Sequence, residues 1–209
     1  MKPMQTTLYY VHDPMCSWCW GFEPTRAQLF DALSGRIQIR RMVGGLAPDS
    51  DAPMPEGMRL GLQQTWHRIE QTIPGTEFNF DFWEKCAPRR STYPANRAVI
   101  AVRGQGEEYD PRMTARIQRA YYLEARNPSD NETLVELAAD IGLDVERFRA
   151  DLLSEATQRS LLAEIQSSRA MGIGSFPSLA VENAGRLTHI GLNYTDADAM
   201  LRQIEAVMG

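Results

Sequence analysis

The chain has 209 residues, of which 43% are hydrophobic and 23% are charged, a balance typical of a folded globular protein. Its 27 acidic and 22 basic side chains give a formal net charge of -5, which argues against a nucleic-acid-binding surface. No apolar run reaches the roughly 18 residues that a membrane span needs, and Met1 to Thr7 lacks the apolar stretch of a secretory signal, so we expect a cytoplasmic protein.

The first predicted element is a buried strand, Thr7 to Val11, which leads into Cys16-Ser17-Trp18-Cys19 and a helix-like run from Phe22 to Leu33. Cysteines at i and i+3 on the first turn of a helix share a face, where their Cα atoms can lie within the roughly 4.4–6.8 Å that a disulfide requires. Cys16 would occupy the helix N-terminus, which favours a thiolate, and Cys19 would be less exposed. The pattern predicts an outer sulfur that attacks and an inner sulfur that resolves a mixed disulfide.

Two other interpretations of the Cys-x-x-Cys pair are weaker. A structural disulfide between i and i+3 closes a very small loop and constrains the unfolded chain little. A zinc site usually needs four ligands, and there is no second Cys-x-x-Cys to supply them. Only Cys86, His12, His67 and His189 remain as further ligands.

The elements after the cysteines complete a β-α-β unit. Pro24 is expected to kink the first helix, because proline removes a backbone hydrogen bond. A second strand, Arg36 to Val43, alternates apolar and polar residues before Gly44-Gly45 breaks it. Two strands joined by a helix are normally parallel with a right-handed connection.

A proline-rich stretch at Pro48, Pro53 and Pro55 marks a boundary, and helical patterns then follow from Gly57 to Met171. Ser129 with Glu132 has the pattern of a capping box for one of these helices. Asp144 is predicted to cap a long helix that runs through Phe148 and Leu152 towards Ile165.

After Gly172 the pattern predicts a hairpin of two strands, Ser178 to Val181 and Leu187 to Ile190. Thr195 and Asp198 then mark the start of a last helix. The order is therefore β-α-β, helical insert, β-β-α. It predicts an α/β protein in which residues 1–50 and 172–209 form one discontinuous domain and residues 51–171 form an inserted helical domain.

A Cys-x-x-Cys on the first helix of such a chain resembles the thioredoxin fold, and the long insertion resembles the DsbA family. The sequence from His12 to Phe22 is similar to that of the FrnE-like cytosolic branch of that family. The sequence from Gly172 to Ser178 resembles the family's cis-proline loop. The resemblance implies a thioredoxin-like α/β fold with a large all-helical, DsbA-like insertion domain.

The resemblance also implies the site. Cys16 and Cys19 would be the catalytic redox pair, and a cis bond before Pro177 would hold the backbone of Phe176 against them to pair with an extended substrate. Ser17 and Trp18 would contact the substrate. The expected substrates are protein or peptide thiols and disulfides. No metal or organic cofactor is expected, and glutathione is a candidate reductant.

One position departs from the family pattern. Thioredoxin and DsbA place an acidic residue six positions before the first cysteine, where this chain has Tyr10. His12 could favour a Cys16 thiolate by charge or hydrogen bonding, or could simply pack or cap. The proton acceptor for Cys19 stays open.

The predicted activity is that of a protein disulfide oxidoreductase or isomerase. One alternative is a glutathione-dependent small-molecule enzyme of the kappa-transferase or hydroxychromene-carboxylate isomerase type, although those enzymes have serine at the position of Cys16. The other is a metal-binding module. The aromatic run Phe78 to Trp83 could line a groove or, as is commoner for large apolar residues, pack the insert.

Overall fold

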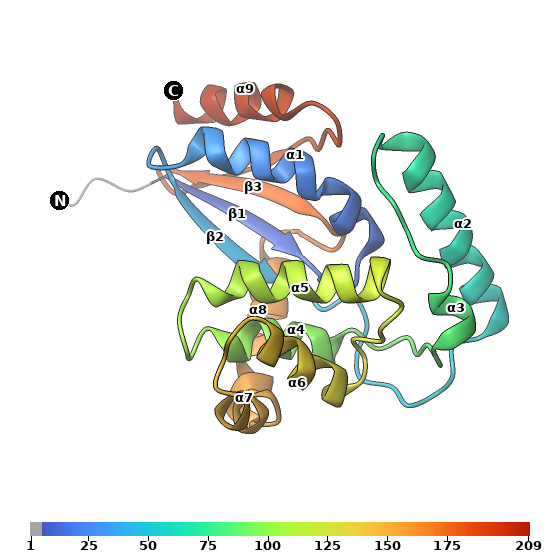
Figure 1. Ribbon diagram of the computed structural model, residues 1–209. Coiled ribbons are helices and arrows are strands. Elements are labelled where there is room, and N and C mark those ends of the chain that lie inside the picture. Colours follow the sequence, from blue (N-terminus) through green and yellow to red (C-terminus); the bar gives the residue numbers. More distant parts are fainter. Residues whose placement is uncertain (1–5) are drawn as a thin grey trace.

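The computed structural model describes residues 6–209 and contains a mixed sheet flanked by helices (Figure 1). Its strands are β1 (Thr7–His12), β2 (Gln38–Val43), β3 (Ser178–Asn183) and β4 (Arg186–Ile190), in the spatial order β2-β1-β3-β4. β1 and β2 run parallel, and β3 is antiparallel to both β1 and β4. The predicted parallel unit and the C-terminal hairpin are thus confirmed. Most of the N-terminal segment expected to lack a secretory signal, residues 1–5, lies outside the described residues.

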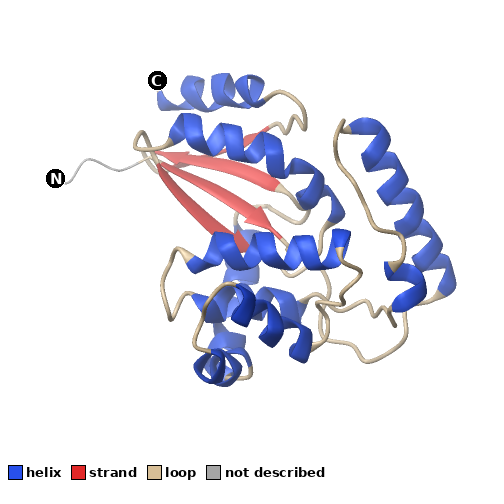
Figure 2. Ribbon diagram, in the orientation of Figure 1, coloured by secondary structure: helices blue, strands red, loops and turns tan. Residues whose placement is uncertain are grey.

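The helices follow the predicted order, and Figure 2 distinguishes them from the strands of the sheet. None of the helices in residues 6–209 is long and apolar enough to cross a membrane. The division into domains at residues 50 and 172 stays a prediction. In chain order the helices are α1 (Ser17–Leu33), α2 (Glu56–Thr72), α3 (Phe82–Lys85), α4 (Tyr93–Val102), α5 (Tyr109–Leu123), α6 (Asn131–Asp140), α7 (Val145–Leu152), α8 (Glu155–Ala170) and α9 (Ala197–Met208).

Strand alternation divides the sheet between two cores. α1 and α9 cover one face (Figure 1), where Leu8 and Tyr10 of β1 pack with Phe22 of α1 and Ile204 of α9. Val11, which points the other way, packs in a smaller cluster with Met42, Ile173 and Ala180. β1 ends at His12 and α1 begins at Ser17, so the first turn of α1 follows closely on the carboxyl end of β1.

A third hydrophobic cluster, drawn mostly from the insert, contains a group of aromatic rings around Trp66 of α2. The Trp66 side chain is fully buried, and its ring centroid lies 4.8 Å from those of both Phe78 and Trp83 and 6.0 Å from that of Phe82. The aromatic run thus packs the insert, which is the commoner of the two predicted roles.

Two capping predictions are wrong. Ser129 is buried and its hydroxyl donates to the carbonyl of Ser91, while Glu132 forms an ion pair with Arg149. These tertiary partners leave no capping box at the start of α6. At the last helix, Asp196 rather than Thr195 is the N-cap, and its carboxylate accepts from Ala199 N.

The single helix predicted from Asp144 towards Ile165 is also wrong, although its start is correct. Asp144 caps α7 by accepting from Arg147 N, as predicted. The helix ends at Leu152, and Ser154 caps α8 by accepting from Thr157 N. A serine hydroxyl that competes for backbone groups can begin a helix in this way, and here it divides the helical run.

Gly21 offers a test of how closely α1 packs on α2. A Cβ at Gly21 would lie 2.7 Å from Ile73 Cδ1 and 2.9 Å from Ile69 Cγ2. We predict that Gly21→Ala destabilises the protein by about 1–3 kcal/mol through overpacking, although alanine is normally the better helix former. Gly61→Ala, with nothing within 4 Å of the added methyl, is the matched control and should stabilise by about 0.5–1 kcal/mol. If urea unfolding showed that both variants change the free energy of unfolding in the same direction, the close packing of α1 on α2 would be contradicted.

Candidate active site

Cys16 and Cys19 lie at the start of α1 with different exposure. Cys16 is the N-cap residue in an extended conformation, and its N–H donates to the carbonyl of Asp13 at 3.0 Å. Cys19, one turn into the helix, is completely buried, whereas Cys16 keeps 7% of its surface exposed. Both are free thiols here, as is Cys86. The predicted outer and inner sulfurs therefore have the expected difference in access.

The loop before β3 lies against Cys16. The Phe176–Pro177 peptide bond is cis, as predicted, and Cys16 Sγ donates to the carbonyl oxygen of Phe176 at 3.3 Å. The ring of Phe176 lies directly over Gly44, where an added Cβ would fall 2.0 Å from a ring carbon. Because only glycine fits there, the end of β2 helps to hold the loop against the first cysteine.

A groove of about 330 Å³ opens beside Cys16, and we refer to it as the active-site groove. Of the predicted site residues, Cys16, Ser17, Trp18 and Phe176 line it, whereas Cys19, Pro177 and His12 do not. The other wall comes mostly from the insert, from the loop before α2, from α2 itself, from the segment before α4 and from α5, with one residue from the loop after β2. Those residues include Leu46, Met54, Leu62, Thr65, Arg89, Arg90 and Tyr121.

The two residues between the cysteines have different surroundings. The hydroxyl of Ser17 is buried and accepts a hydrogen bond from Trp66 Nε1 at 2.9 Å, so it is held by the core of the insert. The ring of Trp18 is half-buried, and its centroid lies 5.0 Å from that of Tyr194. Trp18 is thus the more accessible of the two.

Asp13 is the residue that the sequence did not single out. Its carboxylate is fully buried and accepts four hydrogen bonds. Oδ1 accepts from Met15 N at 2.8 Å, which shapes the turn that leads to Cys16. Oδ2 accepts from Leu46 N at 2.7 Å, from Thr92 Oγ1 at 2.7 Å and from Asn96 Nδ2 at 2.8 Å. Because these partners are 33 to 83 residues away in sequence, no local pattern could have revealed them.

Electrostatics keep Cys19 protonated. Burial raises the pKa of the Cys19 thiol well above its usual value, and the neighbouring Cys16 raises it further, while a hydrogen bond with the Asp13 backbone opposes both. Burial also raises the pKa of Tyr10, with a smaller contribution from nearby Cys19. The position where the resembling family has an acid is thus occupied by a phenol whose own pKa is raised. The charge of Asp13 makes the smallest contribution to the raised pKa of Cys19.

His12 is completely buried, and among the residues that the structure describes neither of its ring nitrogens has a hydrogen-bond partner. Its ring stacks on that of Tyr10 with centroids 4.8 Å apart and planes within 5°. Burial, followed by the positive charges of Arg41 and Arg26, lowers the pKa of His12 well below its usual value. The predicted influence on Cys16 is untested, but any such influence would have to come from a neutral ring.

Within residues 6–209, no group of three or more His, Cys, Asp or Glu side chains is placed to hold a metal ion. Cys86 lies in a neighbouring cavity of about 320 Å³ and its thiol donates to the carbonyl of Ala125 at 3.0 Å.

A family model described as thioredoxin matches residues 9–201. A Nitrosomonas europaea structure, provisionally assigned as a protein disulfide isomerase, has 31% identity and a TM-score of 0.84 over 97% of both chains. The cytosolic disulfide reductase DsbM from Pseudomonas aeruginosa has 29% identity and a TM-score of 0.73, over 96% of this chain and 94% of that one. The predicted thioredoxin-like, DsbA-like fold is confirmed, and the FrnE-like branch stays a prediction.

Among curated proteins, the ClpXP adapter protein SpxH of Halalkalibacterium halodurans is 27% identical over 188 residues, which are 87% of this chain and 60% of that protein. SpxH of Bacillus subtilis is 26% identical over 183 residues, 87% of this chain and 59% of that protein. The chain therefore spans about three fifths of the length of these curated relatives.

The complete burial of the His12 ring predicts a pH dependence of stability. Because its pKa is lower in the folded than in the unfolded state, the unfolded chain binds one more proton as the pH falls below about 6.5. Stability should then fall by up to about 1.4 kcal/mol per pH unit until the folded-state pKa is reached. His12→Phe, which leaves no polar partner unsatisfied, should remove this slope and keep stability at pH 7.5.

The measurement is urea unfolding at pH 7.5, 6.5 and 5.5. His67→Gln and His189→Gln, which change exposed histidines, serve as controls and should keep the wild-type slope. An unaltered slope in His12→Phe would show that His12 is not buried in the neutral form.

Proposed function

The chain belongs to the thioredoxin family, and from that premise we propose that it is a thiol–disulfide oxidoreductase that acts on protein or peptide substrates through Cys16 and Cys19. The supporting observation is the position of Cys16, which lies at the N-terminus of α1, lines the active-site groove and contacts the Phe176 carbonyl at 3.3 Å. Cys19 lies behind it, fully buried and held as a thiol by its raised pKa.

In the reducing direction, the Cys16 thiolate attacks one sulfur of a substrate disulfide. The substrate S–S bond breaks, the departing sulfur takes up a proton, and a mixed disulfide joins Cys16 to the other substrate sulfur. Cys19 then attacks Cys16 Sγ, and its proton passes to the second substrate sulfur as that sulfur leaves. Two electrons move from the dithiol to the substrate, and the Cys16–Cys19 disulfide is the product; oxidation of a substrate dithiol is the reverse sequence.

The cis-proline loop is proposed to position the substrate. An extended chain in the active-site groove would meet the backbone of Phe176 on one side and the exposed face of Trp18 on the other. Main-chain pairing of this kind gives affinity without demanding one sequence, while the side-chain pockets supply specificity. Ser17, whose hydroxyl already bonds to Trp66, would contribute to the shape of the groove more than to hydrogen bonding with the substrate.

Glutathione is the proposed reductant of the Cys16–Cys19 disulfide. The structurally similar DsbM is described as a cytosolic disulfide reductase and has also been solved with GSH. A cytoplasmic location and a cycle supplied by glutathione are therefore the proposal for this chain as well. No metal or organic cofactor enters the mechanism.

A second candidate function is that of an adapter that delivers a protein to a protease. The curated SpxH relatives are named as ClpXP adapters, and the chain matches them over 87% of its length. An adapter would need a protein-binding surface but no dithiol cycling. Binding of the same partner by wild type and Cys16→Ser, with no redox activity in either, would favour this candidate. Stoichiometric glutathione binding without dithiol cycling would instead favour the small-molecule transferase alternative.

Cysteine variants test the oxidoreductase proposal. Cys16→Ser should abolish the reduction of insulin, because it removes the attacking sulfur. Cys19→Ser should accumulate mixed disulfides detectable by intact mass, because the resolving sulfur is lost. Cys86→Ser, which changes the thiol of the neighbouring cavity, is the matched control and should keep wild-type activity. Full insulin reduction by Cys16→Ser would exclude the mechanism.

A further inference from the structure

We propose that the active-site groove selects polypeptide substrates that carry an acidic side chain close to the reacting cysteine, and that Arg90 is the residue that recognises this charge. The inference rests on the proposed function and adds to it a substrate class and a specificity-determining residue. The occupant is an extended acidic segment of another polypeptide.

The first observation is the sign of the charge in the groove. Both ionic residues that line it beside the thiols, Arg89 and Arg90, are cationic, and no acidic residue is among the described residues that line it. The chain as a whole carries a net charge of -5, so a groove with only positive charges differs from its surroundings. Such a lining attracts anionic substrate and repels cationic substrate.

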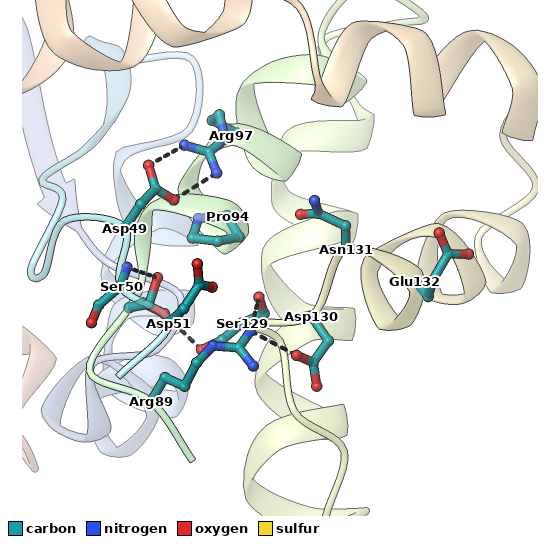
Figure 3. Close-up of a pocket in the computed structure, with 11 residues that line it drawn as sticks. Asp49, Ser50, Asp51, Arg89, Pro94, Arg97, Ser129, Asp130, Asn131 and Glu132 are labelled. Carbon is teal, nitrogen blue, oxygen red and sulfur yellow. Dashed lines mark hydrogen bonds and ion pairs between the residues drawn. The ribbon is translucent and has the colours of Figure 1, made fainter. Parts of the chain in front are cut away.

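The second observation distinguishes the two arginines. Arg89 also lines a polar cavity of about 450 Å³, where its side chain points towards Ser129 and Asp130 (Figure 3). There its Nη2 donates at 2.7 Å to both Asp130 Oδ1 and the carbonyl of Ser129. Arg90 is half-buried and, within residues 6–209, takes part in no hydrogen bond or ion pair. Arg90 is thus the cation of the groove that is available to a ligand.

The remaining lining favours an extended chain as the occupant. Met54 and Leu62 from the insert and Phe176 from the cis-proline loop offer apolar contacts, and the carbonyl of Phe176 lies within hydrogen-bond distance of Cys16 Sγ. The volume of about 330 Å³ accommodates a few side chains rather than a folded surface. A peptide that places its sulfur at Cys16 could therefore place a carboxylate of a nearby residue against the guanidinium of Arg90. Arginine binds a carboxylate through two parallel hydrogen bonds.

Peptide disulfides test this assignment. The substrates are homodimeric disulfides of a short peptide whose two ends are blocked to remove terminal charges. One series of peptides carries Glu, a second Gln and a third Lys, placed in turn at each position within two residues of the cysteine. The second-order rate constant for their reduction by pre-reduced protein is measured for wild type, for Arg90→Gln and for Arg119→Gln. Arg119 is an exposed arginine of α5 outside the groove and serves as the matched control.

At one or more positions, wild type should reduce the Glu peptide about fivefold faster than the Gln peptide, the size expected of a partly exposed ion pair. The Lys peptide should be the slowest. Arg90→Gln should bring the Glu-to-Gln ratio of rate constants close to one, and Arg119→Gln should keep the wild-type ratio.

Equal rates for the three peptides at every position, or a Glu preference that persists in Arg90→Gln, would overturn the inference while leaving the oxidoreductase proposal intact. Failure of wild type to reduce even the Gln peptides would overturn the proposed function itself.

Discussion

The buried carboxylate of Asp13 is the interaction on which the site depends. It joins three parts of the chain: the turn from β1 into α1, the loop after β2 through Leu46 N, and α4 through Thr92 and Asn96. A buried charge is tolerated only when its oxygens are well hydrogen-bonded, and four donors supply that here. The turn that presents Cys16 is therefore held in place from the insert as well as from the sheet.

The insert also contributes directly to the dithiol site. Trp66 bonds to the hydroxyl of Ser17 between the cysteines, and the segment before α4 supplies the arginines of the groove. From the opposite side, the carbonyl of Phe176 accepts from Cys16 Sγ. The asymmetry between the two sulfurs follows from this packing: the outer one faces the groove, and the inner one is enclosed and kept protonated by burial. Tyr10 replaces the acid expected near Cys19, and the raised pKa of the inner sulfur comes first from desolvation and then from the neighbouring Cys16, with Asp13 contributing least.

The sequence predicts those features that local pattern determines. The strand-to-helix setting of Cys16 and Cys19, the order of the elements and the cis bond before Pro177 all follow from periodicity and short motifs, with the resemblance to a known family supplying the last. The features that depend on distant contacts could not be predicted in this way. Nothing near Asp13 in sequence reveals that Thr92 and Asn96 meet it, and nothing near Arg90 reveals that Arg89 alone is paired. The failed capping box has the same cause, because Ser129 bonds to Ser91 instead of its own helix.

The central claim is that Cys16 and Cys19 form one reversible redox couple. The most direct test equilibrates the protein in graded mixtures of reduced and oxidised glutathione, traps the thiols by alkylation and reads them by intact mass and peptide mapping. The claim predicts a single two-electron transition confined to Cys16 and Cys19; a potential near about -120 mV would indicate an oxidant, and one near about -270 mV a reductant. The absence of a Cys16–Cys19 disulfide at every glutathione ratio would contradict it.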